Sequence, residues 1–145
     1  MLSQTAAIFG YIWAGLVLAS GMLIITNIGT IVDIAATDPV QAEAAWTWFN
    51  SVESGIGGGI EVVGGIWILL ASVAAWQAGE LSRPLNILGM ILGVAGIVTV
   101  APVLYEAGTV FGLGFIVWFL WAGVVMMRQE PKEAVLNPAV SSGAI

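Results

Sequence analysis

The chain has 145 residues, of which 59% are hydrophobic and only 8% are charged, and its mean hydropathy is +1.02. A soluble domain carries about 25% charged residues, so this chain lacks the polar surface that water requires and we expect lipid to surround it. It has no cysteine and no histidine, which excludes disulfides, thiolate nucleophiles and imidazole ligands, and we expect no cofactor and no metal. The net charge is −6 with only three cations, so a nucleic-acid-binding surface is excluded as well.

The first apolar run covers residues 6–25 and is not preceded by the basic residues of a signal peptide. A helix of about 20 residues crosses the ~30 Å of bilayer hydrocarbon, so we expect an uncleaved membrane span here. Apolar residues continue at helical spacing beyond Ile25 as far as Ala36, which predicts a helix longer than the bilayer is thick.

The second apolar run, residues 56–76, follows a helix start at Asp38 and Pro39. Aspartate is a favoured N-cap and proline suits the first helical position. We expect this helix to continue without interruption into the second span. The sequence therefore predicts a long helical hairpin that projects past the bilayer between the first two spans.

The third and fourth apolar runs cover residues 85–104 and 110–127. Gly79 is a predicted C-cap of the second helix, and Pro84 is predicted to lie in the first turn of the third. The expected fold is an all-α, integral membrane four-helix bundle over residues 1–133. Residues 134–145 are predicted to form a flexible cytoplasmic tail.

All three cations, Arg83, Arg128 and Lys132, fall on one side of this four-span arrangement. Lysine and arginine near span ends are retained in the cytoplasm. We therefore expect a multi-pass protein of the cell's inner (plasma) membrane with cytoplasmic N- and C-termini.

Glycines in the apolar runs allow helix backbones to approach closely in lipid. They either pack the helices of one chain together or form a homo-oligomer interface. The candidate packing residues are Gly57, Gly58, Gly65, Gly89, Gly93 and Gly112.

Glu61 is an acid inside an apolar run, which costs at least ~2.5 kcal/mol and by default indicates function. Other polar side chains are expected at a similar depth in the membrane or somewhat nearer its outer surface, with no lysine or arginine close by. They are Asn27, Thr99, Tyr105 and Glu53. Glu61 is therefore hypothesised to be protonated and hydrogen-bonded, or to bind a cation in a water-filled vestibule. The alternative is an interhelical hydrogen bond that fixes packing.

Phe111, Phe115 and Trp118 share one face of the fourth predicted span, at positions i, i+4 and i+7. They either fill the core and contact lipid, or form a wall for a flat apolar ligand such as a quinone or carotenoid.

A recognisable pattern extends over three stretches, residues 60–72, 79–96 and 111–118. The first contains an acid and a tryptophan, the second an arginine- and proline-containing loop followed by a glycine-rich span, and the third a tryptophan in the last span. In this pattern the chain resembles uncharacterised multi-span membrane proteins of bacteria and archaea. The loop of this chain reads Leu81-Ser82-Arg83-Pro84, so arginine precedes proline, whereas proline precedes arginine in the loop of those proteins. The resemblance implies the membrane topology and no activity.

Three functions remain open. The first is a structural or accessory protein that forms a homo-oligomer or joins a larger membrane complex. The second is a small cation or proton carrier or channel that uses Glu61, and the third is lipid, quinone or pigment binding between helices. An enzyme is not expected, because the serines have no neighbouring histidine or lysine to act as a base.

Overall fold

The computed structural model describes residues 1–58 and 61–128, and within this part it consists of helices and turns without strands. Three stretches are long and apolar enough to cross a membrane, namely Leu2–Thr37, Pro39–Ala78 and Ala107–Arg128. The remaining apolar helix, Arg83–Val98, has 16 residues. The expectation of an all-helical protein suited to a membrane is thus confirmed.

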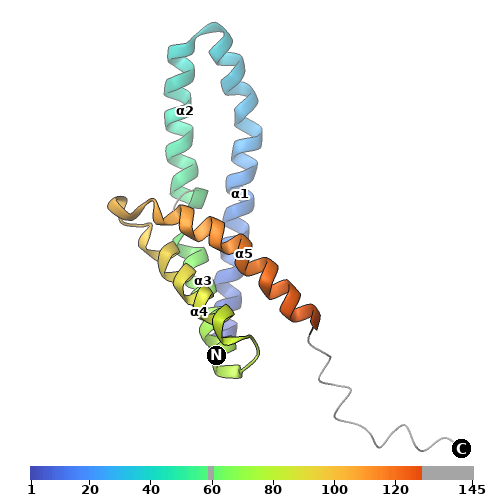
Figure 1. The fold of residues 1–145 in the computed structure, drawn as a ribbon. Coiled ribbons are helices and arrows are strands. Elements are labelled where there is room, and N and C mark those ends of the chain that lie inside the picture. Colours follow the sequence, from blue (N-terminus) through green and yellow to red (C-terminus); the bar gives the residue numbers. More distant parts are fainter. Residues whose placement is uncertain (59–60, 129–145) are drawn as a thin grey trace, which may run out of the picture.

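The first helix, α1, extends from Leu2 to Thr37 and measures about 54 Å at 1.5 Å per residue. It ends at Asp38, whose backbone is extended and whose carboxylate accepts hydrogen bonds from the backbone N–H groups of Val40 and Gln41 at 3.1 and 3.0 Å. This confirms the predicted N-cap of α2, Pro39–Glu53. The two helices then lie side by side in opposite directions (Figure 1).

The chain does not continue from α2 into the second predicted span as one regular helix. A π-helical turn, Ser54–Gly58, contains Gly57 with a φ of 120°, a conformation that side chains with a β-carbon rarely adopt. A new helix, α3, covers Val62–Ala78. The expectation of an uninterrupted helix was therefore wrong, because Gly57 takes non-helical dihedral angles.

The loop after α3 agrees with the sequence patterns. Gly79 caps α3 in the left-handed conformation with a φ of 68°, and Pro84 lies in the first turn of α4, Arg83–Val98. α4 ends before residue 104, because Pro102 restricts Ala101 to an extended backbone. A short 3₁₀ turn, Pro102–Leu104, then leads to α5, Ala107–Arg128.

α3 and α4 contact each other backbone to backbone. A β-carbon added to Gly65 would lie 2.7 Å from the carbonyl oxygen of Gly93, and one added to Gly93 would lie 2.9 Å from that of Gly65. A β-carbon added to Gly89 would instead meet the side chain of Ser72. Gly112 on α5 has open space around it.

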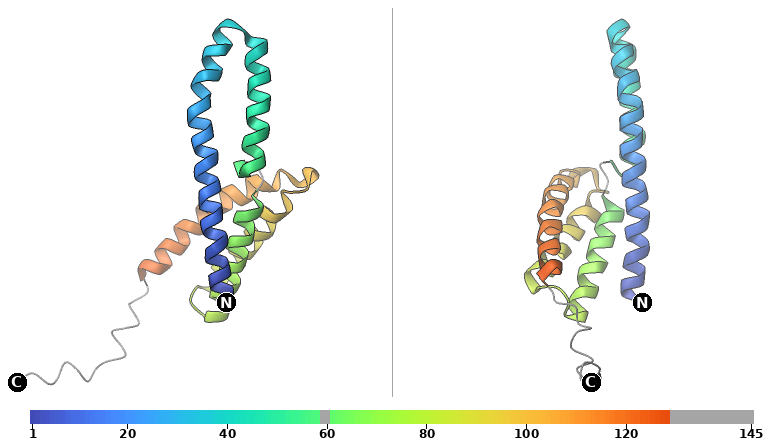
Figure 2. Two further views of the ribbon diagram at one scale, coloured as in Figure 1. Left: turned by 180° about the vertical axis from the view of Figure 1, so that it is seen from behind. Right: turned by 90° about the vertical axis from the view of Figure 1, so that its right-hand side faces the viewer.

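The arrangement has two levels (Figure 2). The N-terminal half of α1 packs on α3, α3 packs on α4, and α4 packs on α5, while the C-terminal half of α1 extends beyond them together with α2. The start of α1, the loop between α3 and α4, and the end of α5 all lie at the same end of the molecule. Lys132 and the predicted tail, 134–145, lie outside the described residues.

Candidate functional site

Glu61 lies at the break between α2 and α3, in the N-cap position of α3. Its carboxylate oxygen Oε2 accepts a hydrogen bond from the indole Nε1–H of Trp13 on α1, at 3.3 Å. Trp13 in turn stacks on Trp67 of α3, with ring centroids 5.5 Å apart. The acid is therefore held by a tryptophan that is itself fixed between two helices.

Thr99 ties the backbone of Glu61 to the end of α4. Its hydroxyl oxygen accepts a hydrogen bond from the Glu61 N–H at 3.0 Å and donates one to the carbonyl oxygen of Gly96 at 2.7 Å. Thr99 is only 2% exposed. The structure thus brings together Glu61 and Thr99, two of the predicted site residues.

Glu53 ends α2 and is buried, at 7% exposure. The hydroxyl of Ser20 on α1 donates a hydrogen bond to its Oε1. Glu53 and Glu61 thus each receive a hydrogen bond from a side chain of α1. Their partners, Ser20 and Trp13, lie two turns apart on α1, a rise of about 10 Å along its axis.

A cavity of about 330 Å³ lies where α1 faces the break, and its lining includes Trp13, the partner of Glu61, but neither acid. Its walls are mostly apolar, but residues of the π-helical turn contribute backbone to them, and Gly57 is not helical there. The lining residues are Trp13, Leu16, Val17, Gly55, Ile56, Gly57, Val62 and Val63.

Two predicted site residues lie elsewhere. Asn27 donates to the carbonyl oxygen of Leu23 at 2.9 Å, one turn back on α1. Tyr105 lies between the 3₁₀ turn and α5 and is 48% exposed. Ser20 and Trp13, which sequence reasoning missed, hold the acids instead, and their i, i+7 spacing on one face of α1 was the available signal.

The two arginines in the described part of the chain lie far from Glu61, at the opposite end of the region formed by α3, α4 and α5. Arg83 begins α4 and Arg128 ends α5, whereas Glu61 precedes the opposite end of α3, a helix about 26 Å long. Within residues 1–58 and 61–128, no three acidic side chains gather into a possible metal site. The two carboxylates thus have uncharged hydrogen-bond donors as partners.

The rings of α5 close the core beside this site. Phe111, Phe115 and Trp118 are all buried, and Phe115 contacts Trp13 with ring centroids 5.1 Å apart. Trp118 meets Trp67 at 6.1 Å and donates from Nε1 to the carbonyl oxygen of Leu85 at 3.1 Å. The space in front of the predicted ligand wall is therefore occupied by tryptophans of the same chain.

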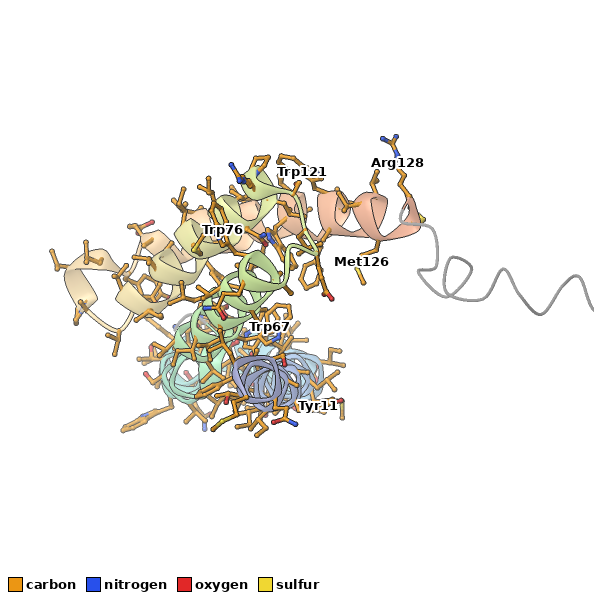
Figure 3. The ribbon with its side chains drawn as sticks, turned by 90° about the horizontal axis from the view of Figure 1, so that it is seen from below. Tyr11, Trp67, Trp76, Trp121, Met126 and Arg128 are labelled. Atoms are coloured by element: carbon orange, nitrogen blue, oxygen red, sulfur yellow. The ribbon has the colours of Figure 1, made fainter. Side chains whose placement is uncertain are left out.

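Trp67 shows how closely these elements pack. Seen from below, it lies between α3 and α1 (Figure 3). A β-carbon added to Gly10 of α1 would come within 2.7 Å of its indole nitrogen.

The fold and the site together define an all-helical chain suited to a membrane, with two acids at a broken helix. No family profile, curated protein or solved structure matches it. The resemblance to uncharacterised multi-span membrane proteins stays a prediction.

Proposed function

We propose that this chain is a multi-span membrane protein that passes protons between Glu53 and Glu61. The observation that carries the proposal is the pairing of two carboxylates at the α2–α3 break, each held by an uncharged donor from α1. Acids at membrane depth are costly, and in membrane proteins they mark proton or ion pathways.

A proton suits this geometry better than a metal ion. Calcium takes six to eight oxygen ligands, and magnesium demands octahedral geometry. Here each carboxylate has its own donor, and the two donors, Trp13 and Ser20, lie two turns apart on α1, a rise of about 10 Å. Two separate carboxyl groups are suited to hold one proton each, and the cavity lined by Trp13 and the break offers room for water nearby.

The charges support an orientation for this pathway. The end with Arg83 and Arg128 would be cytoplasmic, because arginine near span ends is retained there. A bilayer ~30 Å thick placed around α3, α4 and α5 leaves the far part of α1 and most of α2 outside. Glu53 would then lie near the outer surface and Glu61 deeper in the membrane.

Proton flux into liposomes tests the proposal. Purified protein is reconstituted with a pH-sensitive dye inside the vesicles, and a potassium diffusion potential drives proton entry. We expect flux with the native chain and its loss in Glu61→Gln and Glu53→Gln. Asp33→Asn, on the projecting part of α1, is the matched control and should keep native flux. Equal flux in all four proteins, or none in any, contradicts the proposal.

Self-association is a second candidate, favoured by the apolar surface of the projecting helix pair. Val32 on α1, with Val40 and Trp48 on α2, is more than half exposed. Large exposed apolar patches mark interaction sites. Native mass spectrometry in nanodiscs tests this candidate: an oligomer that Trp48→Ser dissociates supports it, and a monomer of the native chain excludes it.

A further inference from the structure

One side of α1 carries exposed apolar side chains at every seventh position. They belong to Tyr11, Leu18, Ile25 and Val32, and they are between 62 and 80% exposed. Seven residues make almost two helical turns, so the four side chains form one row about 32 Å long. Seen from below, Tyr11 lies on the side of α1 that is turned away from Trp67 (Figure 3).

A second exposed row lies beside the first, four residues further along the helix each time. Its members are Gly15, Met22, Gly29 and Ala36, and a β-carbon added to Gly15 or Gly29 meets nothing within 4 Å. Apolar residues that alternate at spacings of four and three form the contact face of a left-handed coiled coil. The eight residues of the two rows are called the outer seam below.

The contacts that α1 makes within the chain use its other side. Trp13 and Ser20, which hold Glu61 and Glu53, each follow a member of the outer seam by two residues. Two residues turn a helix by about 200°, so these partners of the acids lie opposite the outer seam. The packing of α1 on α2 and α3 therefore leaves the outer seam exposed.

Lipid can cover only part of the outer seam. In the placement proposed above, the bilayer surrounds α3, α4 and α5, whereas the C-terminal half of α1 extends beyond them (Figure 2). Gly29, Val32 and Ala36 lie in that half, near the end of α1 at Thr37. Burial of apolar surface from water is worth ~25 cal/mol per Å², which favours a protein partner that follows the seam beyond the bilayer.

The outer seam is suited to a second copy of itself. Two copies in one membrane have the same topology, so their α1 helices run parallel, and equivalent heptad positions of a parallel pair face each other. The outer seam contains no charged residue, so a second copy brings no like charges together in it. Gly15 and Gly29 allow the two backbones to approach closely, and the larger residues between them supply the packing.

We infer that the outer seam of α1 binds the outer seam of a second copy as a parallel two-stranded coiled coil. The inference rests on self-association, the second candidate above, and assigns it an interface on α1. It does not rest on proton transfer. Because Trp13 and Ser20 lie on the opposite side of α1, each copy in such a dimer keeps its own pair of acids.

Disulfide cross-linking in membranes tests the interface, since the chain contains no cysteine. A disulfide needs β-carbons about 3.5–4.5 Å apart, and only residues that face each other across the dimer come so close. Ile25→Cys and Val32→Cys should form covalent dimers on oxidation. Thr30→Cys is the matched control, because Thr30 is exposed on α1 but lies off the outer seam, and it should stay monomeric.

Native mass spectrometry in nanodiscs measures the strength of the association. Val32→Glu places two acids face to face in the outer seam and should weaken the dimer at least tenfold. Thr30→Glu adds the same charge off the seam and should dimerise like the native chain. Both side chains are exposed, so neither change should disturb the folded chain.

The outcomes separate this inference from the other proposals. A monomeric native chain would overturn both self-association and the outer seam. A dimer that survives Val32→Glu, or that cross-links as readily through Thr30→Cys as through Val32→Cys, would overturn the outer seam alone. None of these results depends on proton flux.

Discussion

Trp13 of α1 lies directly against Gly64 of α3, where a β-carbon would come within 2.6 Å of its indole nitrogen. The reverse contact exists one turn away, where Trp67 of α3 lies against Gly10 of α1. Each helix thus presents a tryptophan to the other's glycine. Trp13 also donates a hydrogen bond to Glu61. The position of the Glu61 carboxylate therefore depends on the absence of a side chain at Gly64, which leaves room for the indole.

Gly64→Ala should displace Trp13 and weaken its hydrogen bond to Glu61. Overpacking of this kind costs about 1–3 kcal/mol, so we expect a lower unfolding free energy in detergent. Gly15→Ala is the matched control, since a β-carbon there meets nothing within 4 Å, and it should be neutral or slightly stabilising. Equal stability of Gly64→Ala and the native chain would show that Trp13 is not held in this way.

Gly65→Ala should destabilise the α3–α4 pair. The added carbon would lie 2.7 Å from the carbonyl oxygen of Gly93 and 2.8 Å from the backbone nitrogen of Ile97. Backbone atoms cannot swing aside as a side chain can, so we expect a loss of about 3 kcal/mol, at the upper end of overpacking costs. A denaturant titration followed by circular dichroism measures it. Gly112→Ala, which meets open space, should unfold at or slightly above the native midpoint; a similar loss of stability in both variants would refute the close approach of α3 and α4.

Ser20→Ala removes the donor to a buried carboxylate and should cost about 1–3 kcal/mol of unfolding free energy. A double-mutant cycle with Glu53→Gln isolates the pair, and we expect a clear coupling energy between the two changes. Ser51→Ala is the control, because its hydroxyl donates to the Thr47 carbonyl oxygen on the exposed side of α2. Additive effects of the two changes would mean that Ser20 does not hold Glu53.

Orientation can be measured directly, because the chain contains no cysteine. Single cysteines at Thr37, beside the α1–α2 turn, and at Ser82, beside the start of α4, report the two ends. We expect a membrane-impermeant maleimide to label Thr37→Cys in intact cells and Ser82→Cys only after lysis. The reverse pattern would invert the proposed pathway, and labelling of both from outside would exclude the single membrane crossing expected between the two positions.

Local signals were enough to predict much of the fold. Asp38 with Pro39 and Gly79 with Pro84 each fix a helix end by dihedral preference or capping, which depends on neighbours in sequence alone. The break at Gly57 was missed, because glycines in an apolar run are equally typical of close helix packing.

The site was predicted only in part. Glu61 stood out as an acid in an apolar run, and Thr99 was expected at its level. The partners Trp13 and Ser20 come from contacts between α1 and the α2–α3 break, and such long-range contacts leave only a weak spacing signal in sequence. Asn27 was expected near Glu61 because the two residues lie at a similar depth in the predicted spans. A polar side chain on a helix can also donate a hydrogen bond to the preceding turn of its own helix, as Asn27 does here.

The central claim is that Glu61 exchanges protons as part of a conducting path. A hydrophobic carbodiimide reacts with protonated carboxyl groups that are reachable from lipid, and peptide mass spectrometry then identifies the modified residue. We expect modification of Glu61 in proteoliposomes with a parallel loss of proton flux. Asp33→Asn should be modified at Glu61 and inhibited like the native chain, and Glu61→Gln should carry no modification at position 61. Complete modification of Glu61 with undiminished flux, or flux that survives in Glu61→Gln, would contradict it.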